Sequence, residues 1–187
     1  MPIEIEAKMK VERFDEVRRR LGESGARRVG EVLETNRFFD TPDRKLLAAD
    51  KGLRLRTARD VEGGRERHII TVKGPQRQGE LKSREETEVD VADAQDARRV
   101  LQALGYEPTL SFEKRRESWE LGRCKIELDE LPLLGRFVEI EGPDEPTVMR
   151  LREKLGLADR PLIKTPYIKM LADYLKERSD SRREITF

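Results

Sequence analysis

The chain has 187 residues and a net charge of +1, from 39 Lys and Arg against 38 Asp and Glu; 41% of its residues are charged and 36% are hydrophobic. This length fits one domain, and the balanced charge argues against a nucleic-acid-binding protein, which usually carries a basic excess. One cysteine, Cys124, and one histidine, His68, exclude an internal disulfide and any zinc site built from several Cys or His residues. The polar composition would also fit a disordered chain, but the apolar residues are periodic, which favours a folded core.

The sequence carries no sign of a membrane or export segment. No apolar run approaches the roughly 18 residues that a membrane-spanning helix needs. The first residues lack the basic and apolar regions of a signal peptide. We therefore expect a cytoplasmic protein without a membrane partner.

Eight segments show the alternation of apolar and polar residues that is typical of strands with two different faces. Residues 3–11 show it most clearly, with apolar odd positions and charged even positions from Glu4 to Lys10. The expected strands are residues 3–11, 29–39, 53–56, a segment ending at 73, 84–90, 109–121, 123–130 and 136–142. Because strand follows strand at short spacing, the sheet should be mainly antiparallel.

Four segments carry apolar residues at helical spacing, over residues 14–21, 94–104, 148–155 and 168–175. Residues 40–43, Asp-Thr-Pro-Asp, read as a turn. We expect one domain over residues 1–175. The segment 176–187 is almost wholly charged or polar, and we expect it to be a flexible tail.

The charged strand faces could point to solvent, as they commonly do in antiparallel sheets. Two features favour the interior instead: charges recur on nearly every strand, and both signs occur within one strand. The helices also carry apolar stripes that need a sheet face to cover. If helices cover the apolar outside, the charges line the inside of an eight-stranded barrel, which can enclose a small ligand.

The chain resembles the CYTH superfamily, the triphosphate tunnel metalloenzymes, which includes class IV adenylate cyclases, thiamine triphosphatases and inorganic triphosphatases. The matching motifs run in order from residue 4 to 167: Glu4-x-Glu6-x-Lys8, Phe39-Asp40-Thr41-Pro42-Asp43, Leu53-Arg54-Leu55-Arg56, Thr71-Val72-Lys73, Glu86-x-Glu88, Lys114-x-Arg116, Glu127-Leu128-Asp129, Phe137-Val138-Glu139-Ile140-Glu141, and Lys164 with Tyr167. The resemblance implies an α+β fold with a closed, eight-stranded antiparallel barrel and flanking helices. It also implies dependence on Mg²⁺ or Mn²⁺.

The resemblance assigns the acids to metal and the bases to phosphate. The implied metal ligands are Glu4, Glu6, Asp129, Glu139 and Glu141, which is chemically reasonable because carboxylate oxygens suit hard cations. The implied phosphate-binding residues are Lys8, Arg54, Arg56, Lys73, Lys114, Arg116 and Lys164. Glu86 and Glu88 would orient these bases. Lys8, Glu4 and Glu6 are the expected catalytic residues.

Two reactions fit this set: hydrolysis of a triphosphate such as inorganic triphosphate or ATP, and cyclisation of ATP to cyclic AMP and pyrophosphate. The segments around residues 104–106, 113–116 and 134–139 look most like class IV cyclases, but a shared scaffold does not fix the nucleophile. Thiamine triphosphatases carry Tyr where this chain has Phe38. We recognise no adenine-binding motif in the sequence, and we therefore favour a triphosphatase over a cyclase. A non-catalytic polyphosphate- or nucleotide-binding module is a third hypothesis, and homodimer formation stays open.

Overall fold

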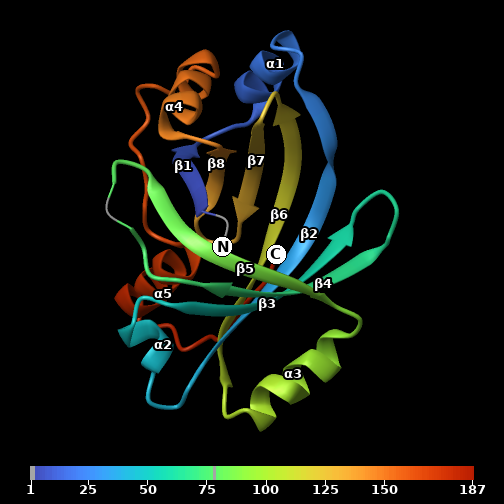
Figure 1. Cartoon of the computed structure of the whole chain (residues 1–187), viewed down its shortest axis with the longest axis vertical. Helices are drawn as coiled ribbons and strands as arrows, with labels where there is room; N and C mark the ends of the chain where they lie inside the picture. The colour runs from blue at the N-terminus through green and yellow to red at the C-terminus, as the bar shows by residue number, and fades with distance from the viewer. Residues whose placement is uncertain (1–2, 78) are drawn as a thin grey trace.

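The structure is a computed structural model that describes residues 3–77 and 79–187, with side chains described from Ile5 onward. The strands are β1 (Ile3–Val11), β2 (Arg27–Asp40), β3 (Gly52–Asp60), β4 (Glu66–Lys73), β5 (Lys82–Val91), β6 (Glu107–Leu121), β7 (Cys124–Leu131), β8 (Gly135–Gly142) and β9 (Glu184–Ile185). The helices are α1 (Asp15–Glu23), α2 (Lys45–Ala48), α3 (Ala94–Ala103), α4 (Glu145–Lys154) and α5 (Tyr167–Glu177). Figure 1 shows α1 and α4 at one end of the molecule and α2, α3 and α5 towards the other.

Eight of these strands close into a barrel. Their order is β2-β3-β4-β5-β1-β8-β7-β6, and β6 pairs again with β2 to complete the ring. Every pair among these eight strands is antiparallel. The predicted eight-stranded antiparallel barrel is therefore confirmed.

The barrel consists of two groups of strands that pair in chain order. β1 joins the two groups on one side, and the β2–β6 pairing, which we call the seam, joins them on the other. β2 to β5 pair in chain order, and so do β6 to β8. β1 joins the two groups, because it pairs with β5 through Ile3–Glu6 and with β8 through Ile5–Val11. The seam between β2 and β6 closes the other side, with register shifts near Gly30 and Phe39.

Helices cover the apolar outside of the barrel. Ala7, Met9 and Val11 of β1 form a buried cluster with residues of α1 and α4. α4 packs closely on β8, because a Cβ at Gly142 would lie 2.8 Å from the Val148 side chain. α3 covers the outside of β3 through Ala97 and Leu101. This arrangement leaves Glu6 and Lys8 of β1 for the interior, as the strand alternation requires.

α5 and the chain end cover another part of the barrel. Leu171 and Leu175 of α5 form one buried cluster with Phe112, Phe137 and other residues. The segment 176–187, which the sequence predicts to be a flexible tail, returns to the barrel here: Ile185 of β9 is 2% exposed, and β9 pairs in parallel with Ser111–Phe112 of β6. The buried Ile185, the N–H of Phe187 that donates to Glu113 and the Phe187 ring beside Arg115 anchor the segment, a signal that overall composition does not show.

The Asp-Thr-Pro-Asp segment is more ordered than a simple turn. The carboxylate of Asp40, which is 5% exposed, accepts hydrogen bonds from the backbone N–H groups of Thr41 (2.7 Å), Leu46 (2.9 Å) and Leu47 (3.1 Å). These contacts fold the next residues into the short helix α2, which the sequence analysis did not predict. In the part of the chain that the structure describes, no helix combines the length and apolarity needed to cross a bilayer.

Candidate active site

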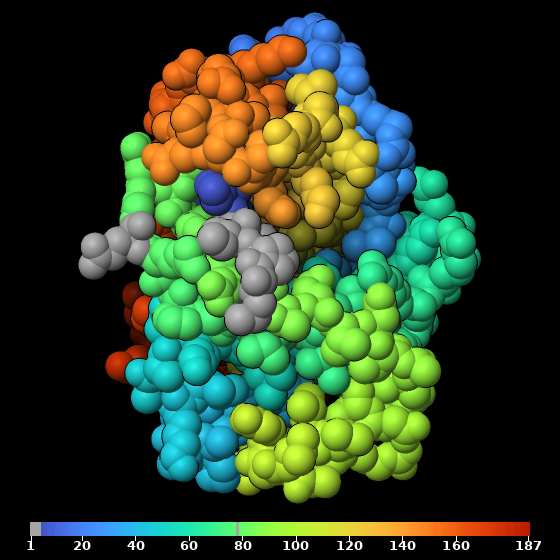
Figure 2. Space-filling view, in the orientation of Figure 1, coloured from blue at the N-terminus to red at the C-terminus, as the bar shows by residue number. Residues whose placement is uncertain are grey.

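One cavity of about 1400 Å³ runs through the barrel. Most of the charged residues singled out from the sequence line it together: Glu6, Lys8, Arg54, Arg56, Lys73, Glu86, Glu88, Lys114, Arg116, Glu139 and Glu141. In Figure 2 the surface is hollowed between the green strand β5 and the yellow strands β6 and β7. The cavity exceeds the roughly 300–1000 Å³ that is usual for small-molecule sites, so it can hold a ligand together with water or ions.

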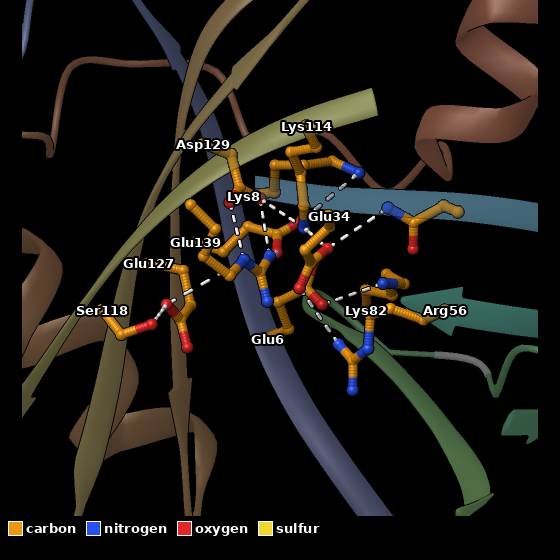
Figure 3. Close-up of polar contacts among 12 residues, drawn as sticks. Glu6, Lys8, Glu34, Arg56, Lys82, Lys114, Ser118, Glu127, Asp129 and Glu139 are labelled. Carbon is orange, nitrogen blue, oxygen red and sulfur yellow. Dashed lines mark hydrogen bonds and ion pairs between the residues drawn. The ribbon is translucent and has the colours of Figure 1, made fainter. Parts of the chain in front are cut away.

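The deepest ion pairs lie between β6, β7 and β8. Arg116 donates through Nε and a terminal nitrogen to Asp129 at 2.7 and 2.6 Å, and the same terminal nitrogen lies 2.6 Å from Glu139 Oε2. Lys114 Nζ lies 3.2 Å from both Asp129 and Glu34. Figure 3 shows this network of alternating charges. Because Asp129 is fully buried, its two bases are needed to compensate its charge.

A second group of charges lies on β3, β4 and β5. Arg54 and Arg56 each approach Glu88 Oε1 at 3.4 Å, and Thr71 Oγ donates to the same oxygen at 2.7 Å. Lys73 pairs with Glu86. The Nε atoms of Arg54 and Arg56 are buried without a hydrogen-bond partner among the described residues. Glu86 and Glu88 thus contact bases as the orienting role requires, and the two guanidinium groups retain donors for a ligand.

Lys8 is 1% exposed and lies between the two groups of charges. Its Nζ donates to the Thr165 carbonyl at 2.6 Å, lies 4.0 Å from Glu139 Oε1 and stands 4.2 Å from the centre of the Tyr167 ring. Burial lowers the pKa of Lys8, and the nearby Glu139 and Glu6 only partly oppose this. Lys8 is therefore held in place by β1, α5 and the segment before α5.

Carboxylates face one another across neighbouring strands on the cavity side of the barrel. Glu6 of β1 stands opposite Glu141 of β8, and Glu139 stands opposite Glu127 of β7. Like charges directly opposite one another destabilise a sheet unless cations lie between them. Lys82 Nζ, 2.9 Å from Glu6 Oε2, supplies one such cation, while Glu6 Oε1 is buried without a hydrogen-bond partner.

Carboxylate oxygens such as these are suitable ligands for a divalent metal ion, although the described side chains do not converge on one point. Among the described residues, no three acids form a ready cluster of metal ligands. Several of them instead pair with bases, as Glu6 does with Lys82 and Glu139 does with Arg116. The unpartnered oxygen of Glu6 and its position opposite Glu141 are suited to an oxygen-liganded cation such as Mg²⁺ or Mn²⁺.

Two of the expected site residues, Asp129 and Lys164, do not line the cavity, and the side chain of a third, Glu4, lies outside the described residues. Asp129 is fully enclosed by Arg116 and Lys114 and does not line the cavity surface. Lys164 is exposed, donates to the carbonyl of Gly79 and is not part of the cavity lining. Metal binding by Asp129 and phosphate binding by Lys164 stay predictions.

The polar cavity residues that the sequence analysis missed include Glu34, Asn36, Lys82 and Arg84. Glu34 and Asn36 share a face of β2, and Lys82 and Arg84 share a face of β5 with Glu86. The same period-two spacing that identified the other charges could have found them. Glu34 matters most for stability, because it is 2% exposed and lies within 3.4 Å of both Lys114 and Arg56.

The charge of Glu34 makes the barrel sensitive to acid. Burial alone would raise the pKa of Glu34, but Lys114, Arg116 and Arg56 together hold it well below the usual pKa of a glutamate, about 4.5. The folded pKa is thus lower than the unfolded pKa, so this stabilisation is present above about pH 4.5 and is lost as the pH falls below it. We expect the free energy of unfolding, measured by urea titration, to fall between pH 5 and pH 3, and Glu34→Gln to show a weaker dependence. An equally steep loss in Glu34→Gln would contradict this.

Comparison with known proteins agrees with this geometry. The family model for the CYTH domain matches residues 2–163. The chain belongs to the CYTH family. A putative adenylate cyclase of Methanocaldococcus jannaschii is 29% identical over 139 residues, which cover 74% of this chain and 76% of that protein. The adenylate cyclase CyaB of Aeromonas hydrophila is 34% identical over 107 residues, which cover 57% of this chain and 51% of that protein.

A solved structure has the same fold. A protein of Pyrococcus horikoshii superposes with a TM-score of 0.79 at 26% identity and covers 91% of this chain and 99% of its own. CYTH members are triphosphatases or adenylate cyclases, and the tunnel enzymes among them generally depend on a divalent metal. The charged cavity of this CYTH domain is therefore its candidate active site.

Proposed function

We propose that this CYTH domain is a divalent-metal-dependent triphosphatase that hydrolyses the terminal phosphate of inorganic or organic triphosphates. The observation that carries the proposal is the coexistence, in one cavity, of unpartnered guanidinium donors and of carboxylates facing one another. Simple anion binding would need only basic residues. The facing carboxylates therefore argue against a non-catalytic binding module. The Glu6–Glu141 pair adds a place for a cation beside the bound anion.

The bases of the cavity can hold the phosphate chain in place. Arg54 and Arg56 offer planar donors to phosphate oxygens, while Glu88 and Glu34 fix their orientation. Lys114 and Arg116 extend the positive surface along β6. In the transition state these groups stabilise the charge that spreads over the phosphoryl oxygens.

The residues that would hold Mg²⁺ or Mn²⁺ are Glu6, Glu139 and Glu141, with Glu4 and Asp129 as further predicted ligands. A bound divalent cation would neutralise phosphate charge and make water a better nucleophile at neutral pH. A water oxygen then bonds to the terminal phosphorus while the bond from that phosphorus to the bridging oxygen breaks. Inorganic triphosphate and water thus give phosphate and pyrophosphate.

Adenylate cyclase activity is the second candidate. The curated relatives named adenylate cyclases support it. The cavity also has an apolar region where Phe38 and Phe112 stack at 5.9 Å, with Leu110 and Ile168 in the same lining. In that reaction the ribose 3′-oxygen would attack the α-phosphorus of ATP. The adenine ring of ATP would need contacts in such an apolar region.

Product identification decides between the two reactions. With Mg²⁺ or Mn²⁺ present, we expect inorganic triphosphate to give phosphate and pyrophosphate faster than ATP is consumed, and ATP to give ADP and phosphate. Phosphorus nuclear magnetic resonance distinguishes these products directly, and excess EDTA is the control that should stop turnover. Formation of cyclic AMP and pyrophosphate from ATP, with inorganic triphosphate inert, would replace the triphosphatase by the cyclase. No turnover of any triphosphate, with binding retained, would favour the non-catalytic module.

A further inference from the structure

Arg84 of β5 is a buried cation of the cavity that has no role in the scheme above. It is 5% exposed and lines the cavity. Its Nε and one terminal nitrogen are buried without a hydrogen-bond partner among the described residues. The Asp50 carboxylate lies 3.7 Å from that terminal nitrogen, which is too far for a hydrogen bond. A buried guanidinium with two unused donors is unfavourable unless a ligand supplies the acceptors.

The backbone around Arg84 is fixed by hydrogen bonds. Asp50 accepts through its other oxygen from the N–H of Gln76 at 2.6 Å. The N–H of Gly74 donates to the carbonyl of Glu85 and that of Arg77 to the carbonyl of Ser83, both at 2.8 Å. These contacts hold the segment after β4 against β5 on both sides of Arg84. The guanidinium is thus presented by a well-supported part of the barrel.

Strand register places Arg84 at one end of the set of basic residues. Along β5, Lys82 stands opposite Glu6 of β1, and Arg84 stands opposite Glu4, one step farther from Lys8. Such a step of two residues is about 6.7 Å. Two residues beyond Arg84 along β5, Glu86 stands opposite Lys73 of β4. Lys73 in turn stands opposite Gly52, at the start of β3 and close in sequence to α2. Arg84 therefore lies beyond Lys73, towards α2.

We propose that Arg84 binds the oxygens of a phosphoryl group at the α2 end of the tunnel, as a substrate-binding residue in addition to Arg54, Arg56 and Lys73. This inference rests on the proposed function. A guanidinium presents two parallel N–H donors that match two oxygens of one phosphoryl group. The unused Nε and terminal nitrogen of Arg84 are such a pair.

Calorimetric titration of the whole protein with inorganic triphosphate, in EDTA to prevent turnover, tests the inference. We expect Arg84→Gln to weaken binding about 10- to 100-fold, the range for hydrogen bonds to charged groups. Arg84→Lys, which keeps the charge without the planar fork, should recover part of the loss. The matched control is Arg77→Gln, which removes an exposed arginine paired with Glu85 and should change affinity less than about twofold.

Thermal unfolding separates a binding role from a structural one. Because the Arg84 donors are unpartnered, Arg84→Gln should unfold no lower than the wild type without ligand, whereas a large loss of stability would overturn the inference. Unchanged triphosphate affinity in Arg84→Gln, with weakened affinity in Arg54→Gln, would also overturn it and leave the proposed function standing. A wild-type protein that neither binds nor hydrolyses triphosphate would overturn the proposed function, and this inference with it.

Discussion

Replacing Glu6 by Gln is expected to lower the turnover of inorganic triphosphate at least about 100-fold, since even indirect damage to a metal site costs about 10- to 100-fold. A neutral amide is a poorer ligand for a hard cation than a carboxylate. The fold should survive, because losing the charge relieves the repulsion from Glu141 while it weakens the pair with Lys82.

The measurement is the turnover rate over a range of Mg²⁺ concentrations, with thermal unfolding as the check on the fold. Glu130→Gln is a matched control, because Glu130 lies on β7 with its ion pair to Arg136 on the outside of the barrel. It should leave turnover unchanged. If Glu6→Gln kept most of its turnover at every Mg²⁺ concentration, Glu6 would not be a metal ligand.

The second large effect concerns stability: Arg116→Gln should lower the free energy of unfolding by about 3–5 kcal/mol. Among the described residues, the substitution leaves the fully buried Asp129 with Lys114 as its one ion-pair partner, at 3.2 Å. It also removes the hydrogen bond to Glu139. Urea titration near neutral pH measures the loss.

The neighbouring Arg115→Gln is the matched control. Arg115 points outward, with a side chain 52% exposed and a 3.6 Å ion pair to Glu130, so its loss should be within about 1 kcal/mol. Adding Asp129→Asn to Arg116→Gln should cost less than the sum of the two single changes, because the uncompensated charge is then gone. A loss below about 1 kcal/mol in Arg116→Gln would contradict the role given to this ion pair.

Strand alternation predicted much of the barrel, because one face of each strand had to be apolar and the other charged. The alternation of residues 3–11 survives in the structure as the buried Ala7 and Met9 on one face and Lys8 in the cavity on the other. What alternation could not give is the closure of the ring. The β2–β6 seam pairs residues as far apart as Arg27 and Glu120, and no local pattern specifies such a contact.

The candidate site was predictable where charges fell within a recognisable motif and was missed where the period-two spacing extended beyond one. Lys82 and Arg84 lie on the same face of β5 as Glu86, and the register with β1 sets them opposite Glu6 and Glu4. Lys164 belongs to a matching motif, yet its chain segment points it towards Gly79. The chain end shows the same limit, since Ile185 is buried beside a stretch of β6 that pairs with β2 on one edge and that β7 does not reach on the other.

The double pairing of β1 has a consequence for the order in which the protein can assemble during synthesis. β1 is made first, but its neighbours are residues 82–85 on one side and residues 136–142 on the other. The strand that carries Glu6 and Lys8 therefore has no partner for its β8 edge until residues 136–142 have been made. Closing contacts over such long sequence separations is entropically slow, so the pairing of β1 is completed late and the strand is exposed to wrong pairing in the meantime.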